Sequence, residues 1–181
     1  MTPCRVAVLA SGGGSNLGAL FDHFDALGAT TPAQVALVAS NQPSAGALAR
    51  AAARRVPTAV IDTPGDADAL LAVLRAHDTD LVVLAGYLKL VPAAVTDAFA
   101  GRIVNVHPAL LPRHGGHGMY GARVHRTVLA AGDTESGATV HLVDAAYDRG
   151  AAIVQAHVPV VPGDTADTLA ARVLRSEHFV L

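Results

Sequence analysis

The chain has 181 residues, 51% of them apolar, with a formal net charge of −2, a single cysteine (Cys4) and a single lysine (Lys89). This composition excludes an intrachain disulfide framework and an apolar run of the roughly 18 residues that span a membrane, and it shows no broad basic face for nucleic acid. The length suits one domain with a substantial core, and a strand-like start without a secretion signal predicts a soluble, cytoplasmic protein.

Short β-branched runs alternate with alanine-rich helical patterns, which is typical of parallel βαβ construction. We predict, in chain order, a strand at 5–10, a helix at 15–26, a strand at 35–39, a helix at 45–54, a strand at 58–61, a helix at 66–77, a strand at 81–85, a helix at 92–99, a strand at 103–106, a helix at 124–131, strands at 138–143 and 152–160, and a helix at 165–176. The predicted fold is α/β, one domain over 1–181 with a single doubly wound, mostly parallel sheet and helices on both faces. Ligands bind such sheets beyond the carboxyl ends of the strands, here after Ala10, Ala85 and Val106.

A glycine-rich turn at residues 11–17, SGGGSNL, follows the first predicted strand. Glycines let backbone N–H groups approach a ligand closely, and the N-terminus of the next helix attracts phosphate. Ser15 and Asn16 are expected to cap that helix or to bind the phosphate themselves. A Walker A loop needs a lysine here, and a dinucleotide fingerprint needs glycine at Leu17, so neither pattern is met. The turn predicts a phosphate monoester site, and the alternative is a tight turn without a ligand.

The predicted strand at 103–106 leads into Asn105, His107 and Pro108. Asn105 and His107 alternate, so both side chains project to one face, and Pro108 leaves His107 at the carboxyl end of the strand. A carboxamide can donate a hydrogen bond to a developing oxyanion, and an imidazole exchanges protons near neutral pH. The pair predicts chemistry at this edge, with a polar strand end as the alternative.

Residues 105–112, NVHPALLP, resemble the hallmark of the formyltransferase family that uses 10-formyltetrahydrofolate. The turn at 11–17 resembles the phosphate loop of the branch that formylates glycinamide ribonucleotide. Residues 84–89 resemble the folate-side strand and loop, residues 139–143 with Asp148 resemble the catalytic-aspartate loop, and residues 163–165 with 177–178 resemble the late turn and closing helix. The resemblance implies a Rossmann-like fold, 10-formyltetrahydrofolate as co-substrate without a metal, glycinamide ribonucleotide of purine synthesis as acceptor, and a monomer or homodimer.

The resemblance also implies a role for each matching residue. Asn105 would stabilise the oxyanion of a tetrahedral intermediate, His107 would transfer protons or stabilise the oxyanion when charged, and Asp148 would favour the charged imidazole and hold a water molecule. The substrate would be held by Gly12, Gly13, Gly14, Ser15, Asn16, His141 and Glu177. The folate would be held by Leu84, Leu88, Lys89, Leu90, Val95, Ile103 and Asp144, the backbone of Leu88, Leu90 and Asp144 reading the pterin and Lys89 meeting the glutamate tail. Taken singly, the apolar members also fit ordinary core positions, and Asp148 fits a turn.

The sequence departs from the family pattern at three places. Arg149 stands where the family has the first of two glycines, and the segment at 113–121 is longer and richer in glycine. We expect that segment to be a mobile loop near the substrate that can also act as a lid, with a metal site at His114, His117 and His125 as the alternative. The chain also stops at Leu181, soon after the matching part of the closing helix, so that either the chain is incomplete or the final element is lacking.

Other functions remain open at this point. A 10-formyltetrahydrofolate hydrolase would use the same Asn, His and Asp, but such enzymes usually carry an N-terminal regulatory domain. Methionyl-tRNA formyltransferases carry a C-terminal tRNA-binding domain, and sugar-amine formyltransferases give less reason for the glycine-rich turn. Outside the enzymes, a phosphate-binding module would keep the turn without needing Asn105, His107 and Asp148 together.

Overall fold

The computed structural model describes residues 2–181, which form seven strands and six α-helices. The elements are β1 (Cys4–Leu9), α1 (Ser15–Leu27), the 3-10 helix η1 (Gly28–Thr30), β2 (Ala33–Ser40), α2 (Gly46–Ala53), β3 (Thr58–Val60), α3 (Ala67–Ala76), β4 (Leu81–Leu84), α4 (Ala93–Ala98), β5 (Ile103–His107), α5 (Ala122–Ala130), β6 (Glu135–Leu142), β7 (Ala152–Pro159) and α6 (Ala166–Val180). The strand order is β3-β2-β1-β4-β5-β6-β7. The predicted α/β fold with a single, mostly parallel sheet is therefore confirmed. Among residues 2–181, no helix is long and apolar enough to cross a membrane.

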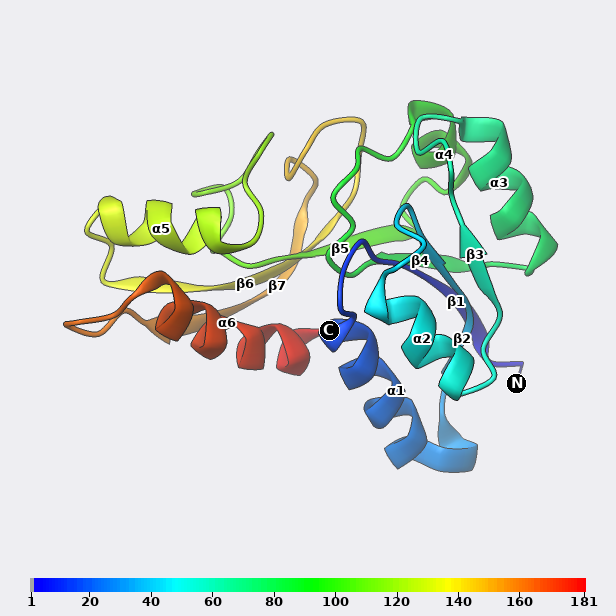
Figure 1. The fold of residues 1–181 in the computed structure, drawn as a ribbon, viewed down its shortest axis with the longest axis horizontal. Coiled ribbons are helices and arrows are strands. Elements are labelled where there is room, and N and C mark those ends of the chain that lie inside the picture. Colours follow the sequence, from blue (N-terminus) through cyan, green and yellow to red (C-terminus); the bar gives the residue numbers. More distant parts are fainter. Residues whose placement is uncertain (1) are drawn as a thin grey trace. The chain divides into compact units, whose positions relative to one another are not determined.

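The chain forms two compact units, of which the first runs up to Val104. In this unit β1 pairs in parallel with β2 and β4, and β2 pairs in parallel with β3. The chain moves outward from β1 through β2 to β3 and then returns to β4 on the other side of β1. Right-handed crossovers therefore put α1 and α2 on one face of these strands and α3 on the opposite face. Helices α1 and α2 lie side by side, and α3 packs on α4 (Figure 1).

The core of the first unit forms around β1, because this strand has a neighbour along each edge and helices over each face. Val8 and Leu9 have no exposed surface, and Leu17 of α1 and Leu70 of α3 are equally buried. Each fully buried leucine contributes roughly 2 kcal/mol of transfer free energy. This packing fixes the carboxyl end of β1, from which the glycine-rich turn departs.

The second unit, Asn105–Leu181, is built on the antiparallel hairpin of β6 and β7. Helix α6 runs along both strands (Figure 1), and α5 packs on α6. Their shared core consists of Val128, Ala138, Val158, Leu169 and Val173. A Cβ atom at Gly137 would lie 2.0 Å from the carbonyl oxygen of Ala156, so only glycine permits this approach of the two strands. Strand β6 begins at Glu135, whereas the predicted strand began at 138, because the first three residues of β6 are small or polar and do not resemble a buried strand.

Helix ends depart from prediction for identifiable reasons. The expectation that Ser15 or Asn16 caps α1 is wrong, because the N-cap is Gly14 in the left-handed region (φ 73°) and no side chain caps the helix. Helix α6 runs to Val180 rather than 176, since neither glycine nor proline follows to end it. Its start has a capping box between Thr165 and Thr168, which stabilises the first turn.

Candidate functional site

The glycine-rich loop of the first unit, residues 11–16, joins the carboxyl end of β1 to α1. A Cβ atom at Gly14 would lie 2.8 Å from the Cα atom of Ala47, so the left-handed, crowded position requires glycine. The carbonyl oxygen of Gly12 accepts a hydrogen bond from Ala47 N at 3.1 Å, and that of Gly13 accepts from Arg50 Nε at 2.8 Å. Both carbonyl groups are thus held by α2. The first N–H groups of α1 have no intrahelical acceptor, and together with the helix dipole they favour an anion.

Ser11 connects this loop to the turn after β4. Its N–H donates to Gly86 O at 3.0 Å, and its hydroxyl accepts from Leu88 N at 2.9 Å and donates to Asn41 Oδ1 at 2.6 Å. The turns after β1, β2 and β4 are therefore tied together at the carboxyl ends of their strands, where the fold rule places ligands.

The residues predicted for folate separate into two groups. Leu88 and Leu90 are 46% and 44% exposed, and Lys89 between them is also exposed. Leu84, Val95 and Ile103 are buried and pack in the core of the first unit. The turn at 88–90 is therefore accessible to a ligand, whereas the other three residues are core residues. Asp144, in the second unit, is exposed, and its carboxylate accepts a hydrogen bond from Ala146 N at 2.9 Å.

The polar cluster of the second unit is centred on His107, the last residue of β5, whose side chain is 4% exposed. Its Nε2 lies 2.8 Å from the carbonyl oxygen of His114. Because a carbonyl group only accepts, Nε2 must carry a proton. The other ring nitrogen, Nδ1, lies 3.5 Å from Asp148 Oδ2. Nδ1 is therefore the nitrogen at which this ring gains and loses a proton.

Asp148 lies in a loop between β6 and β7 with a left-handed backbone (φ 55°). Its Oδ2 accepts a hydrogen bond from Gly116 N at 2.8 Å, and its Oδ1 lies 3.4 Å from Asn105 Nδ2 and 3.5 Å from His141 Nε2. A strained backbone at a residue with so many polar contacts is typical of a functional site.

Asn105 and His141 complete the cluster. His141 Nδ1 donates to the carbonyl oxygen of Leu142 at 2.8 Å, and its Nε2 accepts from Asn105 Nδ2 at 3.0 Å. One amide hydrogen of Asn105 is thus engaged by His141. The second faces Asp148 Oδ1, and the distance of 3.4 Å between Nδ2 and Oδ1 is longer than in an ordinary N–H···O hydrogen bond. This second N–H is therefore the one that can donate a hydrogen bond to another oxygen.

Burial and charge shift the pKa values of the cluster. Burial lowers the pKa of His107, and the carboxylate of Asp148 opposes this by a smaller amount. Burial also raises the pKa of Asp148, but the neighbouring rings of His141 and His107 and the hydrogen bond from Gly116 N outweigh it and hold the pKa below its usual value. The pKa of His125 is lowered by burial and then by the charge of His107. The resting cluster therefore favours a neutral imidazole beside an ionised carboxylate.

The structure brings together four polar residues that the sequence singled out, Asn105, His107, His141 and Asp148, but the sequence did not predict the segment that holds them. Asp133 binds the ring of His114, with 2.6 Å between Oδ2 and Nε2, and also pairs with Arg113. The only sequence signal was the glycine-rich departure at 113–121.

Glu177 lies buried on α6, and His117 of the loop contacts the ring of Tyr147 edge-on with 5.5 Å between centroids. Within residues 2–181 no group of three or more His, Cys, Asp or Glu side chains is arranged to hold a metal ion.

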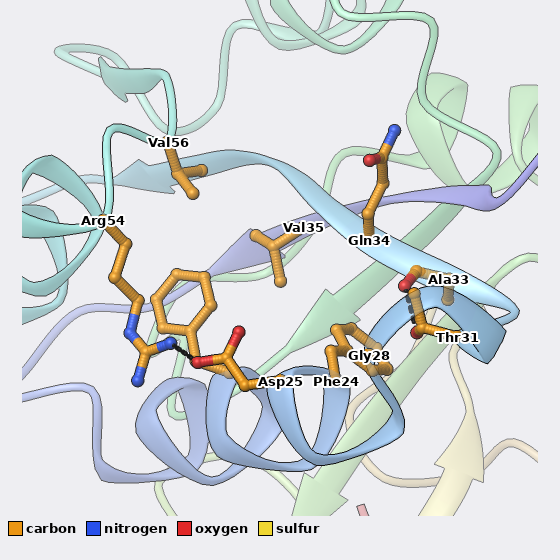
Figure 2. Close-up of a pocket in the computed structure, with 10 residues that line it drawn as sticks. Phe24, Asp25, Gly28, Thr31, Ala33, Gln34, Val35, Arg54 and Val56 are labelled. Atoms are coloured by element: carbon orange, nitrogen blue, oxygen red, sulfur yellow. Dashed lines mark hydrogen bonds and ion pairs between the residues drawn. The ribbon is translucent and has the colours of Figure 1, made fainter.

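A separate hollow of about 540 Å³ lies on the first unit, between α1, the start of β2 and the end of α2. Figure 2 shows Phe24, Val35 and Val56 on its walls, with Arg54 and Asp25 paired at one side. The guanidinium of Arg54 also lies 4.7 Å from the ring centroid of Phe21. None of the residues predicted for substrate or folate lines this hollow.

Comparisons with known proteins agree with this picture. The family model described as formyl transferase matches residues 4–181. A chloroplastic phosphoribosylglycinamide formyltransferase of Arabidopsis thaliana is 40% identical over 181 residues, which cover 96% of this chain and 61% of the relative. One from Haemophilus influenzae is 37% identical, with 97% of this chain and 82% of the relative covered. The crystal structure of phosphoribosylglycinamide formyltransferase from Anaplasma phagocytophilum superposes with a TM-score of 0.90 at 37% identity, covering 98% of this chain and 82% of that one. The chain thus spans less than two thirds of the plant relative's length.

Proposed function

The chain belongs to the formyl transferase family, and from this premise we propose that it transfers the formyl group of 10-formyltetrahydrofolate to the amine of glycinamide ribonucleotide. The observation that carries the proposal is the cluster of Asn105, His107, His141 and Asp148, in which an ionised carboxylate, a buried imidazole and a carboxamide contact one another. The names of the relatives from Haemophilus influenzae and Anaplasma phagocytophilum, which the chain covers to 82%, support the choice of acceptor.

The reaction we propose is direct attack of the acceptor amine on the formyl carbon. The new C–N bond gives a tetrahedral intermediate whose oxygen becomes an oxyanion, and collapse breaks the bond to the folate nitrogen. One proton must leave the attacking amine and one must reach the departing nitrogen, so the proton count is balanced by a single shuttling group. Asn105 would donate its second amide hydrogen to the oxyanion.

His107 is the proposed shuttle, and its environment favours the base role over that of a charged stabiliser in the resting protein. Burial lowers the pKa of the ring, so Nδ1 carries a lone pair that can accept the amine proton. Once protonated, Nδ1 is stabilised by Asp148 Oδ2 at 3.5 Å until it returns the proton to the leaving nitrogen. Asp148 would also hold the water molecule through which protons pass.

Substrate recognition is assigned to separate parts of the chain. In the first unit, Gly12, Gly13, Gly14, Ser15 and Asn16 would bind the substrate phosphate at the N-terminus of α1. The turn at 88–90 would bind the folate, with Lys89 near its glutamate tail. In the second unit, His141 would orient Asn105, Glu177 would accept hydrogen bonds from the ribose, and the backbone of Asp144 would contact the pterin. We also propose a cytoplasmic location and a monomer or homodimer, which fractionation and sedimentation would test.

The test is folate deformylation, followed by absorbance with 10-formyltetrahydrofolate in the presence and absence of glycinamide ribonucleotide. We expect turnover only with the ribonucleotide, and its loss in His107→Ala. Equal turnover without the ribonucleotide would assign a hydrolase, and no turnover with either would refute this acceptor.

A further inference from the structure

Residues 114–116, which we call the clamp, hold two ionisable side chains of the cluster, those of His107 and Asp148, through their backbone. The carbonyl oxygen of His114 accepts from His107 Nε2 at 2.8 Å, and the N–H of Gly116 donates to Asp148 Oδ2 at 2.8 Å. Between them, a Cβ atom at Gly115 would lie 2.5 Å from Leu111 Cδ2 and 3.1 Å from Asp148 Cβ. The clamp therefore fits tightly against the cluster and decides which nitrogen of His107 carries the resting proton.

The clamp is held in a conformation that it would not adopt unaided. His114 has φ 54°, in the left-handed region, which is unfavourable for a residue with a side chain. Its ring nitrogen Nε2 donates to Asp133 Oδ2 at 2.6 Å, and Arg113 pairs with the same carboxylate. The side chain of Asp133 is 10% exposed and that of His114 is 15% exposed. Two consecutive residues tied to one carboxylate thus restrain the backbone at its strained point.

Asp133 is itself placed by the core of the second unit. It lies between the end of α5 at Ala130 and the start of β6 at Glu135, and its N–H donates to the carbonyl oxygen of Val128 at 3.4 Å. Val128 is 1% exposed and packs against Leu169 and Val173 of α6. The core of the second unit therefore fixes the position of the Asp133 carboxylate, which binds Arg113 and His114 of the glycine-rich segment.

We propose that Asp133 is a positioning residue: by holding His114 it keeps the clamp carbonyl on Nε2 of His107, so that Nδ1 is the nitrogen that takes and returns the proton. Without this anchor, His114 can relax out of the left-handed region and turn its carbonyl group away. His107 can then carry its proton on Nδ1 and donate it to Asp148 Oδ2, which leaves no lone pair on the nitrogen that must accept the amine proton. The consequence for rate rests on the proposed function, whereas the consequence for the tautomer does not.

The groups that act on the charge of His107 are Asp148, His141 and His114, and His107 acts in turn on His125. Asp133 reaches His107 through the backbone of His114. A variant at Asp133 therefore keeps every one of these groups in the chain and changes only what holds the clamp. This separates positioning from a direct electrostatic effect.

The experiment compares the full-length Asp133→Ala and Asp133→Asn variants with wild type and with Asp164→Ala as matched control. Asp164 is likewise a shielded carboxylate of the second unit, 3% exposed and paired with Arg172. Long-range ¹⁵N–¹H spectra of the imidazole rings report the tautomer of His107, assigned by its loss in His107→Gln. In the free protein we expect the Nε2–H form in wild type and Asp164→Ala, and a mixture of both tautomers in Asp133→Ala. In the formyl transfer assay, kcat of Asp133→Ala should fall about tenfold, the change that 1.4 kcal/mol produces, with little change in KM.

The proposal is overturned if the His107 signals of a folded Asp133 variant match wild type, because any loss of rate would then be merely structural. A tautomer change with unchanged kcat would also overturn it, since Nδ1 would have no part in the reaction. Asp133→Asn keeps the side-chain size and carries the test if the alanine variant does not fold. If wild type transfers no formyl group, the proposed function fails, while the spectra still decide whether Asp133 positions His107.

Discussion

Burial lowers the pKa of His107, and the carboxylate of Asp148 opposes this shift. Replacement of Asp148 by asparagine removes the carboxylate with little change in the shape of the side chain. Asp148 Oδ2 lies 3.5 Å from His107 Nδ1, and the two side chains are 9% and 4% exposed. At that separation two unit charges interact with about 5 kcal/mol at an effective dielectric constant of about 20, and with about 1 kcal/mol in water. A transition state that bears about half of the imidazolium charge would lose about 2–3 kcal/mol, so we expect kcat/KM to fall about 100-fold.

The pH dependence of kcat/KM in the same variant shows the direction in which Asp148 shifts the pKa of His107. Burial lowers the pKa of His107 and Asp148 partly offsets this, so removal of the carboxylate lowers the pKa of the ring further. A base that acts as the neutral ring is lost as the pH falls through its pKa. The acid limb of kcat/KM should therefore move to lower pH in Asp148→Asn, while the plateau falls.

The assay is the pH profile of folate deformylation with saturating glycinamide ribonucleotide, with Asp167→Asn as control for an exposed carboxylate of the same unit. An acid limb that moves to higher pH, or a plateau within about threefold of wild type, would refute the electrostatic argument. It would mean that Asp148 acts on His107 too weakly, or that the charged ring is the form that acts first.

Three further predictions concern the loops and the stability. Gly14→Ala should raise KM for the ribonucleotide and lower the melting temperature, because its Cβ atom would meet Ala47 and the residue has a left-handed φ. Gly12→Ala, whose Cβ atom would have no other atom within 4 Å, should leave the melting temperature near wild type, and equal melting temperatures of the two variants would contradict this. Gly115→Ala should cost about 1–3 kcal/mol by overpacking and reduce kcat, as chemical denaturation and the transfer assay would show, and an unchanged kcat would refute the close fit of the clamp. Since burial lowers the pKa of His107 and His125 below 6.5, the unfolded chain binds more protons, so stability should fall as the pH drops below about 6.5; His125→Asn should flatten that decline in urea titrations, and an equally steep one would contradict the assignment.

The first unit was largely predictable from local sequence. The apolar run of β1 and the three glycines after it have one physical interpretation, a buried parallel strand that ends at a turn beside a helix N-terminus. What could not be predicted is that Gly14, not Ser15 or Asn16, forms the helix cap. That choice depends on the contact of Gly14 with Ala47, a residue of a different helix.

The polar cluster was predictable only in part. Its side chains can be recognised in the sequence, but the backbone groups that bind them cannot. Asn105 and His107 are two residues apart on a strand, so their shared face follows from the period of the strand. Asp148 was selected by family resemblance, and its proximity to His107 is now seen in the geometry. His107 is oriented by a hydrogen bond to the carbonyl oxygen of His114, and Asp148 by a hydrogen bond from the N–H of Gly116. Nearly every residue carries such backbone groups, so the sequence could not show which ones take part.

The glycine-rich departure at 113–121 follows from the same geometry. A lid over the substrate was expected there, and residues 114–116 of this segment contact His107 and Asp148 and so belong to the polar cluster. A side chain at Gly115 would displace Leu111 and crowd Asp148, and His114, which has a left-handed φ although it carries a side chain, is bound by Asp133. The resting proton of His107 therefore depends on a loop that departs from the family pattern, and differences between relatives in this loop are expected to appear as differences in the acid limb of the rate profile rather than in substrate affinity.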